Sequence, residues 1–271
     1  VKQDFIVVCM VAILYIRCKR FSIPFNRILR YTFSIMMKFL FYFILLPALL
    51  PVVLIIWYVY SQDKKEREPV GMVLKVLIWG ALFSLIDIPV ERLLQGVIQT
   101  YYPGETVEYE LAENFFGVAC VEEFTKWLVL YIFVWKSRNF DYKFDGIVYA
   151  VASALGFAGL ENIIYVCNYG TSVAFSRALF AIPGHASFGI LMGYFLSRAK
   201  HFELDGNGFL STLCMLLCLV CPICVHGAYD FLLSPAAEAQ SFSAYFLVLV
   251  IVIDIVAFLI VRHESKTDRP L

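Results

Sequence analysis

Two adjacent glutamates and a lysine lie in the middle of a long apolar stretch that runs from Phe116 to Trp135. These residues are Glu122, Glu123 and Lys126. An ionised side chain at the centre of a bilayer costs about 2.5–3.5 kcal/mol on insertion scales, so groups of this kind need partners and mark functional sites. Lys126 follows the glutamates at spacings of four and three residues, so its ammonium group can neutralise either carboxylate on one helix face.

Other polar residues stand inside separate apolar segments: Glu161, His185, His226 and Asp230. The spacing of His226 and Asp230 allows one helix to offer two ligands to a metal ion, or a histidine with the carboxylate that orients it. Two histidines with carboxylates suit zinc, which lowers the pKa of a bound water to about 7, and a further carboxylate could act as general base. The alternative is a set of buried ion pairs that fix helix packing. Convergence of groups from four helices favours a reaction site.

The composition is that of a polytopic membrane protein. The chain has 271 residues, of which 61% are hydrophobic, and its mean hydropathy is +0.77. Soluble domains are about 45–50% apolar, so we expect an all-α transmembrane helical bundle. The net charge of zero gives no support for a nucleic-acid partner. The eight cysteines lie almost entirely in apolar segments, which argues against a disulfide framework.

Apolar runs of spanning length predict seven core helices. Their expected ranges are 39–60, 70–90, 113–135, 144–167, 177–198, 209–232 and 243–261. Residues 5–16 form a shorter apolar run, too short to span. We therefore divide the chain into an N-terminal extension (1–38), a domain of spanning helices (39–262) and a cytoplasmic tail (263–271). One hypothesis places the native start at Met36 or Met37, with the upstream residues as a non-native or poorly ordered extension.

Loop charges predict the orientation of the bundle. The loops 61–69, 136–143 and 198–208, together with residues 262–271, hold eleven Lys and Arg residues, against three on the other side when counting starts at Met37. The positive-inside rule makes the first side, with the C-terminus, cytoplasmic. At 1.5 Å per residue, Glu122, Glu161, His185 and His226 then lie about 9–13 Å below the exterior surface. We expect the longer acidic connection 91–112 to be a loop that gates substrate entry on that side.

Four motifs in order resemble the PrsW family of intramembrane peptidases. They are Glu122-Glu-Phe-Thr-Lys126, Asp145-Gly-Ile-Val-Tyr149 with Gly156-Phe-Ala-Gly-Leu-Glu161-Asn162, Arg177-Ala-Leu through His185, and His226-Gly-Ala-Tyr-Asp230-Phe. Asp63-Lys-Lys-Glu-Arg-Glu68-Pro69 also resembles the first cytoplasmic loop of that family. The resemblance runs from about residue 40 to about residue 262. The family is similar in turn to the CAAX prenyl endopeptidases and bacteriocin-immunity proteins.

The resemblance implies site residues. It assigns catalysis to Glu122, Glu123 and His185, with Glu122 as the base and Glu123 paired with Lys126. The resemblance implies a divalent metal, zinc, with Glu122, His185, His226 and Asp230 as its ligands. Some members of the wider clan are argued to work without metal, with glutamate and histidine activating water directly.

Supporting roles are expected for four residues: Glu161, Asn162, Lys126 and Arg177. Arg177 is expected to neutralise Glu161, and Asn162 or a histidine to stabilise the oxyanion. Asp87 and Asp254 are expected to be packing partners, Gly156 and Gly159 to allow close helix contact, and the cysteines from Cys214 to Cys224 to have no metal role.

The resemblance also implies a substrate class. It predicts a site-1-type cut in a single-span protein near the outer boundary of a bacterial cytoplasmic membrane, with an anti-sigma factor of envelope-stress signalling as the family analogy. Two alternatives stay open at this point. One is a proton-coupled transporter, because intramembrane carboxylates and histidines also form proton relays, although no inverted repeat is visible. The other is a non-catalytic immunity or scaffold protein of the same clan.

Overall fold

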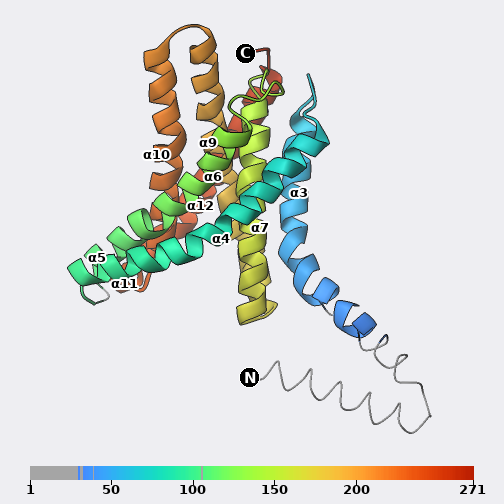
Figure 1. Cartoon of the computed structure of the whole chain (residues 1–271). Helices are drawn as coiled ribbons and strands as arrows, with labels where there is room; N and C mark the ends of the chain where they lie inside the picture. The colour runs from blue at the N-terminus through green and yellow to red at the C-terminus, as the bar shows by residue number, and fades with distance from the viewer. Residues whose placement is uncertain (1–29, 31–32, 39, 105) are drawn as a thin grey trace. The chain divides into compact units, whose positions relative to one another are not determined.

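Helices make up most of the described chain (Figure 1). The structure is a computed structural model that describes residues 30, 33–38, 40–104 and 106–271. Its elements are η1 (Leu40–Leu45), α3 (Leu46–Gln62), α4 (Val70–Tyr101), α5 (Val107–Ala112), η2 (Glu113–Ala119), α6 (Cys120–Phe133), α7 (Asp145–Tyr169), α8 (Ser172–Leu179), α9 (Ala181–Leu204), α10 (Gly208–Leu232), α11 (Pro235–Ala239), η3 (Phe242–Tyr245) and α12 (Phe246–Lys266).

The chain divides into two compact units, Val1–Pro47 and Ala48–Leu271. The first contains the π-helix η1, and the short apolar run at 5–16 lies outside the described residues. The second contains every predicted site residue. The segment expected as a tail, 263–271, is in part the last turn of α12, and the backbone N–H of Leu271 donates a hydrogen bond to the Asp141 carbonyl at 2.7 Å.

Within the described residues, six helices are long and apolar enough to cross a membrane. They are Phe33–Gln62, Val70–Tyr101, Asp145–Tyr169, Ser172–Leu204, Gly208–Leu232 and Phe246–Lys266. The remaining predicted span, 113–135, is formed by η2 and α6 in one continuous helical run. This run carries three charged side chains close together, Glu122, Glu123 and Lys126, which sets it apart from the six apolar helices. The prediction of a polytopic helical bundle is confirmed.

The expectation of a loop over 91–112 is wrong, because α4 continues to Tyr101 and α5 begins at Val107. Polar residues such as Arg92 and Gln95 are good helix formers, so the end of an apolar run does not end a helix. At 1.5 Å per residue the 32 residues of α4 extend about 48 Å, which exceeds the roughly 30 Å of a hydrocarbon core. Figure 1 shows this helix crossing α7 obliquely.

The predicted span 177–198 is longer than expected and is bent. Helix α8 ends at Leu179 and α9 begins at Ala181, with Phe180 between them outside the regular helical region (φ −121°). Pro183 lacks a backbone N–H and cannot bond to the carbonyl four residues earlier, which accounts for the break. The bend precedes His185 directly, so it sets the direction of the helix turn that carries this residue.

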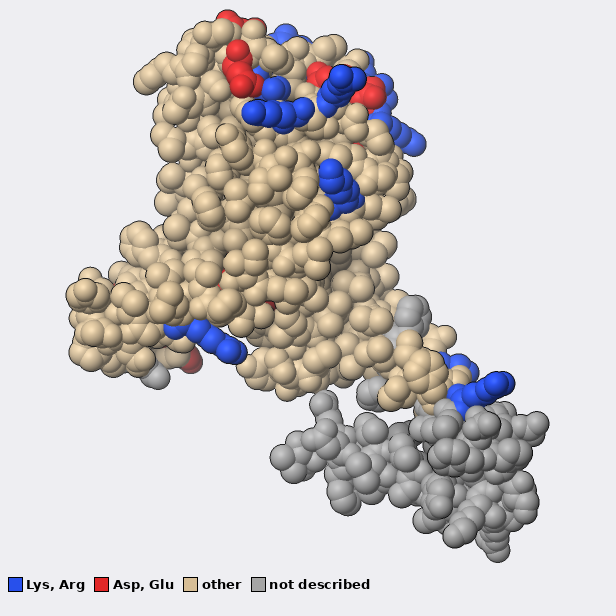
Figure 2. Space-filling view, in the orientation of Figure 1, with Lys and Arg blue, Asp and Glu red and all other residues tan. Residues whose placement is uncertain are grey.

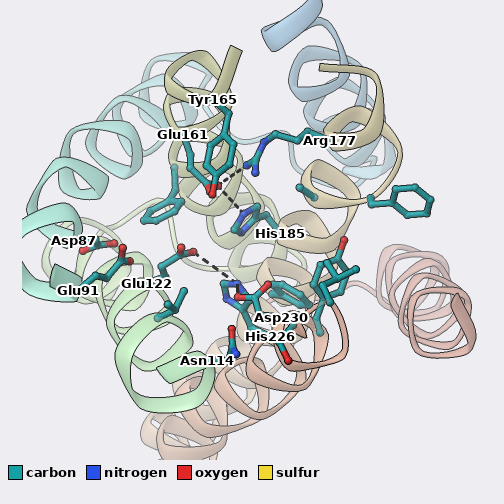
Figure 3. A pocket seen from close by; sticks show the side chains of 18 of the residues that line it. Asp87, Glu91, Asn114, Glu122, Glu161, Tyr165, Arg177, His185, His226 and Asp230 are labelled. Atoms are coloured by element: carbon teal, nitrogen blue, oxygen red, sulfur yellow. Dashed lines mark hydrogen bonds and ion pairs between the residues drawn. The ribbon is translucent and has the colours of Figure 1, made fainter. Parts of the chain in front are cut away.

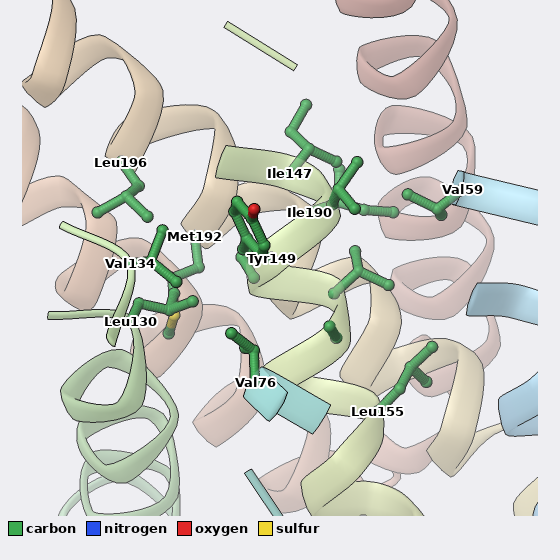
Figure 4. Packing of buried hydrophobic residues seen from close by; sticks show 14 of the residues in the cluster. Val59, Val76, Leu130, Val134, Ile147, Tyr149, Leu155, Ile190, Met192 and Leu196 are labelled. Atoms are coloured by element: carbon green, nitrogen blue, oxygen red, sulfur yellow. The ribbon is translucent and has the colours of Figure 1, made fainter. Parts of the chain in front are cut away.

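Small residues let the central helix α7 approach its neighbours closely. A β-carbon on Gly156 would overlap the Leu77 carbonyl oxygen of α4, and one on Gly193 of α9 would overlap the Gly146 carbonyl oxygen. Close approach of this kind drives helix association in membranes, where apolar burial alone gives no preference over lipid. The expected role of Gly156 in helix contact is therefore confirmed. Figure 4 shows the apolar core around α7, with Leu155, Ile190 and Met192 among its buried members.

Charged side chains gather at one end of Ala48–Leu271. Figure 2 shows most of the visible Lys and Arg over the end where Figure 1 places the C-terminus and the turn between α9 and α10, with a broad uncharged belt beside it. Large apolar side chains such as Leu93, Val248 and Ile251 are exposed. Such exposure fits a lipid-facing surface, since soluble monomers rarely leave apolar patches of this extent uncovered.

Candidate active site

A cavity of about 760 Å³ lies between the helices. Figure 3 shows the side chains that point into it, including Glu122 of α6, Glu161 of α7, His185 of α9 and His226 of α10. These residues lie toward the ends of their helices that are away from the Lys- and Arg-rich end. The structure therefore brings the predicted polar groups from four helices to one place.

The Lys126 ammonium group connects the two glutamates of α6 to α9. Its Nζ lies 3.0 Å from Glu122 Oε2 and 2.7 Å from Glu123 Oε1, and 3.1 Å from His185 Nδ1. The Ser153 hydroxyl donates to the Lys126 carbonyl at 3.0 Å, which ties this turn of α6 to α7. The i,i+3 and i,i+4 spacings read from the sequence thus produce two ion pairs at once rather than one.

Glu161 holds His185 from the opposite side. Its Oε2 lies 3.1 Å from His185 Nε2 and 2.7 Å from Arg177 Nη2. Arg177 thus neutralises Glu161, as expected. Arg177 Nε also donates to Asn162 Oδ1 at 3.0 Å, and Asn162 Nδ2 donates to the Ala48 carbonyl at 2.8 Å. Since both ends of the Asn162 amide are engaged within the protein, Asn162 positions Arg177 and is poorly placed to stabilise an oxyanion.

The second histidine is held by three carboxylates. His226 Nδ1 lies 2.8 Å from Glu123 Oε1, and its Nε2 lies 3.1 Å from Asp230 Oδ2 and 3.9 Å from Glu122 Oε2. The ring of His226 also stacks on Phe188, with 4.7 Å between the centroids. A ring fixed on three sides has little freedom, so its nitrogens keep their directions toward α6 and the cavity.

The two adjacent glutamates differ in access. Glu122 lines the cavity, whereas Glu123 and Lys126 do not. Glu123 has 0% of its surface exposed, and its Oε2 has no hydrogen-bond partner among the described residues. Neighbouring helical residues point about 100° apart, so one glutamate can face a cavity while the next faces the helix contact. This difference separates a group that can reach substrate from one that cannot.

The donor atoms fit a transition metal in type and spacing. Glu122, Glu123, His185 and His226 each offer one ligand atom, and these four atoms lie within 4.8 Å of one another. Imidazole and carboxylate donors are those that zinc prefers. Each imidazole nitrogen already contacts a carboxylate or an ammonium group, so a bound ion would replace at least one of these contacts. Asp230 is not one of the four and contacts them through His226.

The charges at the site favour an additional positive group. Four carboxylates pair with Lys126 or with one of the two histidines: Glu122, Glu123, Glu161 and Asp230. Among the described residues, the Lys and Arg side chains that pair with them are Lys126 and Arg177. Uncompensated buried charges are costly, so two imidazolium groups or one divalent metal ion would balance the remainder.

Sequence reasoning missed Glu91 as a cavity residue and assigned a minor role to Asp87. Glu91 lines the cavity, although it was placed in a loop, and Asp87 lines it one turn earlier on α4. Asp87 Oδ2 accepts a hydrogen bond from the Thr125 hydroxyl at 2.9 Å, which fits the packing role expected for it, but its Oδ1 has no partner among the described residues. The i,i+4 spacing of two acids at the end of an apolar run is the signal that could have shown them together.

Two lesser expectations concern groups outside the cavity. Asp254 accepts a hydrogen bond from the Ser187 hydroxyl at 2.8 Å, which confirms its role as a packing partner. Cys218 is fully buried and its sulfur lies 3.2 Å from the Met192 carbonyl oxygen. The residues from Cys214 to Cys224 belong to neither group of potential metal ligands found in the described chain.

A multi-pass helical bundle with carboxylates and histidines around one cavity is the arrangement expected of an intramembrane hydrolase, and comparison with known proteins agrees. Residues 68–258 match the family described as PrsW family intramembrane metalloprotease. Protease PrsW of Oceanobacillus iheyensis is 36% identical over 207 residues, covering 76% of this chain and 87% of that protein. Protease PrsW of Bacillus subtilis is 34% identical over 191 residues, covering 70% and 83%.

This chain belongs to the PrsW family and is an intramembrane protease. Family membership favours a peptidase over the transporter and scaffold alternatives. No solved structure matches the chain.

Proposed function

We propose that this protein hydrolyses a peptide bond of a membrane-anchored protein, with Glu122 as the general base. The observation that carries the proposal is the unequal access of the paired glutamates: Glu122 lines the 760 Å³ cavity and Glu123 is sealed behind it. Glu122 lies 3.0 Å from the Lys126 ammonium and 3.9 Å from His226, so the carboxylate is held in one place before substrate arrives. A fixed base next to a cavity is the arrangement that proton abstraction from water requires.

The other residues of the site hold the catalytic side chains in position or polarise the substrate carbonyl. Glu123 balances Lys126 and holds His226 Nδ1, and Asp230 holds His226 Nε2. His185 lines the cavity between Lys126 and Glu161, so a histidine is the better placed donor to the tetrahedral oxyanion. Arg177 lines the same cavity and fixes Glu161. Glu122, once it has taken a proton from water, can pass that proton to the leaving amine.

A single divalent metal, zinc by its ligand preference, fits this site. His185 and His226 would hold it, with Asp230 orienting His226 from behind and Glu122 beside them as the base. When bound, zinc supplies a Lewis acid that lowers the pKa of water.

The substrate we propose is a single-span protein that is cut near its outer membrane boundary. The site lies away from the Lys- and Arg-rich end of the bundle, which the positive-inside rule assigns to the cytoplasm together with the C-terminus. The end of α4 and helix α5, which replace the expected gating loop, line the cavity through Glu91 and Glu110 and form one side of the substrate entrance. A bacterial cytoplasmic membrane and an anti-sigma factor substrate follow from the family analogy.

Comparative membrane proteomics tests this function. Cells that express the wild type are compared with cells that express Glu122→Gln, and N-terminal labelling identifies single-span proteins cut only by the wild type. Gln preserves the size of the side chain and removes its basicity. The matched control is Glu108→Gln, on the exposed face of α5. Wild type and control should yield the same new N-terminus, and Glu122→Gln should leave that protein intact. Equal cutting by Glu122→Gln would refute the assignment.

A further inference from the structure

A second set of carboxylates, two of them buried, lies far from the active site. Glu66 and Glu68 precede α4, and Asp145 is the first residue of α7. One ligand atom from each lies within 4.8 Å of the others. Asp145 precedes Glu161 by 16 residues on the same helix, which is about 24 Å along its axis. We name Glu66, Glu68 and Asp145 the loop cluster.

Two members of the loop cluster are fully buried, and each has one oxygen fixed and one left over. Tyr149 donates its hydroxyl to Glu68 Oε2, and the backbone N–H groups of Asp141 and Tyr142 donate to Asp145 Oδ2 at 3.0 and 2.5 Å. Glu68 Oε1 and Asp145 Oδ1 are buried and have no hydrogen-bond partner among the described residues. Donors that fix one carboxylate oxygen orient the other, as second-layer hydrogen bonds do around metal ligands.

No cationic side chain balances these carboxylates. Among the described residues, no Lys, Arg or His forms an ion pair with a member of the loop cluster, and the neighbouring Lys65 and Arg67 are exposed. Two more buried carboxylates lie beside it: Asp63 accepts the backbone N–H of Glu68 at 3.0 Å, and Asp268 accepts that of Phe144 at 3.0 Å. Each of these also has one oxygen without a partner. A buried charge with no partner is costly, so the compensation must come from outside the chain.

We propose that the loop cluster binds one hard divalent cation, Mg²⁺ or Ca²⁺, through Glu68 Oε1, Asp145 Oδ1 and the Glu66 carboxylate. The donors are all oxygens, which these cations prefer and which do not favour zinc. The positive ends of α4 and α7 favour the ionised carboxylates at their N-termini. The cation joins loop 63–69 to the start of α7 and to the C-terminal segment that packs against Phe144. The rival arrangement is a proton shared between Glu68 and Asp145.

Cation titration of the full-length protein tests the proposal. The protein in nanodiscs is treated with chelator and dialysed, and its thermal unfolding is followed while MgCl₂ or CaCl₂ is added at constant ionic strength. Burial raises the pKa of Glu68 to about 7, so the titration is run at pH 8, above that value. Ligand binding to the folded state alone predicts a Tm that rises and saturates with cation concentration. A Tm that does not rise with either cation would overturn the proposal.

Substitutions of the proposed ligands test whether the cation that raises Tm binds at the loop cluster. Glu68→Gln and Asp145→Asn should each weaken the apparent affinity about tenfold or more, the scale seen when a residue that supports a metal site is lost. Asp205→Asn, an exposed acid in the turn after α9, should leave it unchanged. Should either buried variant fail to fold, the exposed Glu66→Gln gives a second test and should weaken binding in part. A cation response that is the same in wild type and Glu66→Gln, or a Glu68→Gln protein with wild-type affinity, would refute the site.

Terbium luminescence gives an independent readout. Tb³⁺ replaces Ca²⁺ at oxygen sites, and Tyr149, which contacts Glu68, is close enough to sensitise it. Emission should be displaced by Ca²⁺ in the wild type and lost in Asp145→Asn. Emission that persists in Asp145→Asn would place the ion elsewhere.

Discussion

The active site and the loop cluster each contain buried carboxylates and share helix α7, through Glu161 and Asp145, but they compensate the charge in different ways. In the active site, the Lys126 ammonium pairs with Glu122 and Glu123, and Arg177 pairs with Glu161. In the loop cluster, buried oxygens of Glu68 and Asp145 have no donor. The active-site carboxylates pair with cationic side chains of the same protein. The loop cluster needs an ion or a proton from outside.

The difference separates a reaction site from a structural one. A carboxylate that is held by internal cations stays ionised next to a cavity, and such a group can act as a base. A buried carboxylate that lies away from the cavity and has no cationic partner can instead bind an ion from solution. The same residue type therefore has two roles, and the partners of each oxygen decide between them.

The largest effect is expected from removing the internal cation. Lys126→Met should lower the free energy of unfolding by about 3–5 kcal/mol, because it leaves Glu122 and Glu123 buried with one cation fewer. Glu123→Gln in the same chain should recover part of this loss. Denaturant unfolding in detergent micelles measures both. An unchanged midpoint for Lys126→Met would show that the carboxylates are balanced in some other way.

The paired glutamates should respond differently to the same substitution. Glu122→Gln should reduce cleavage by about 10²- to 10⁴-fold, the usual contribution of a general base, with little change in Tm. Glu123→Gln should lower Tm more than Glu122→Gln, since it weakens the contacts to Lys126 and His226 that hold the site together. Activity and Tm measured on one preparation check the contrast. The reverse order of the two Tm values would contradict it.

These residues show which side-chain contacts could be predicted from the sequence alone. The contacts of Lys126 with the glutamates and of Asp230 with His226 follow from i,i+3 and i,i+4 spacing, so both could be predicted. The contact of Tyr149 with Glu68 joins residues 81 positions apart, and no periodicity encodes such a distance. The side of α6 that faces the cavity also depends on how η2 and α4 pack. For this reason the roles of Glu122 and Glu123 could be separated by resemblance but not by spacing.

The extent of α4 could not be predicted for a different reason. Hydropathy marks where a helix enters the polar region and not where its hydrogen bonding ends, so residues 91–101 were taken as a loop. The helix continues and brings Glu91 to the cavity.

Helices α4 and α7 cross at Gly156, which lies between the loop cluster and the active site along α7. Gly156→Ala should destabilise the protein by about 1–3 kcal/mol. The added β-carbon would overlap the Leu77 carbonyl oxygen, which belongs to the backbone of α4 and cannot rotate away as a side chain could. Gly96→Ala is the matched control on α4, since nothing lies within 4 Å of its added carbon. It should stabilise by about 0.4–1 kcal/mol. Equal effects of the two substitutions on Tm would show that the crossing is looser than described.

The smallest change in stability is expected for a loop-cluster variant in protein from which divalent cations have been removed. In chelator-treated protein, Glu68→Gln should raise the stability by about 1 kcal/mol, because the amide can donate a hydrogen bond to Asp145 Oδ1, which has no donor now. The sign is opposite to that expected for Glu123→Gln. Thermal unfolding in chelator shows it, and a loss of stability in Glu68→Gln under these conditions would remove the contrast between the two sets.

The product of the reaction gives the most direct test of Glu122 as the base of an intramembrane peptidase. The new N-terminus of the membrane-bound fragment is mapped by mass spectrometry with the wild type and with Glu122→Gln, on a substrate found by the proteomic comparison. The account predicts a cut near the outer boundary of the substrate's span with the wild type and no such fragment with Glu122→Gln. The same fragment from both proteins, or a cut in the cytoplasmic third of the span, would contradict it.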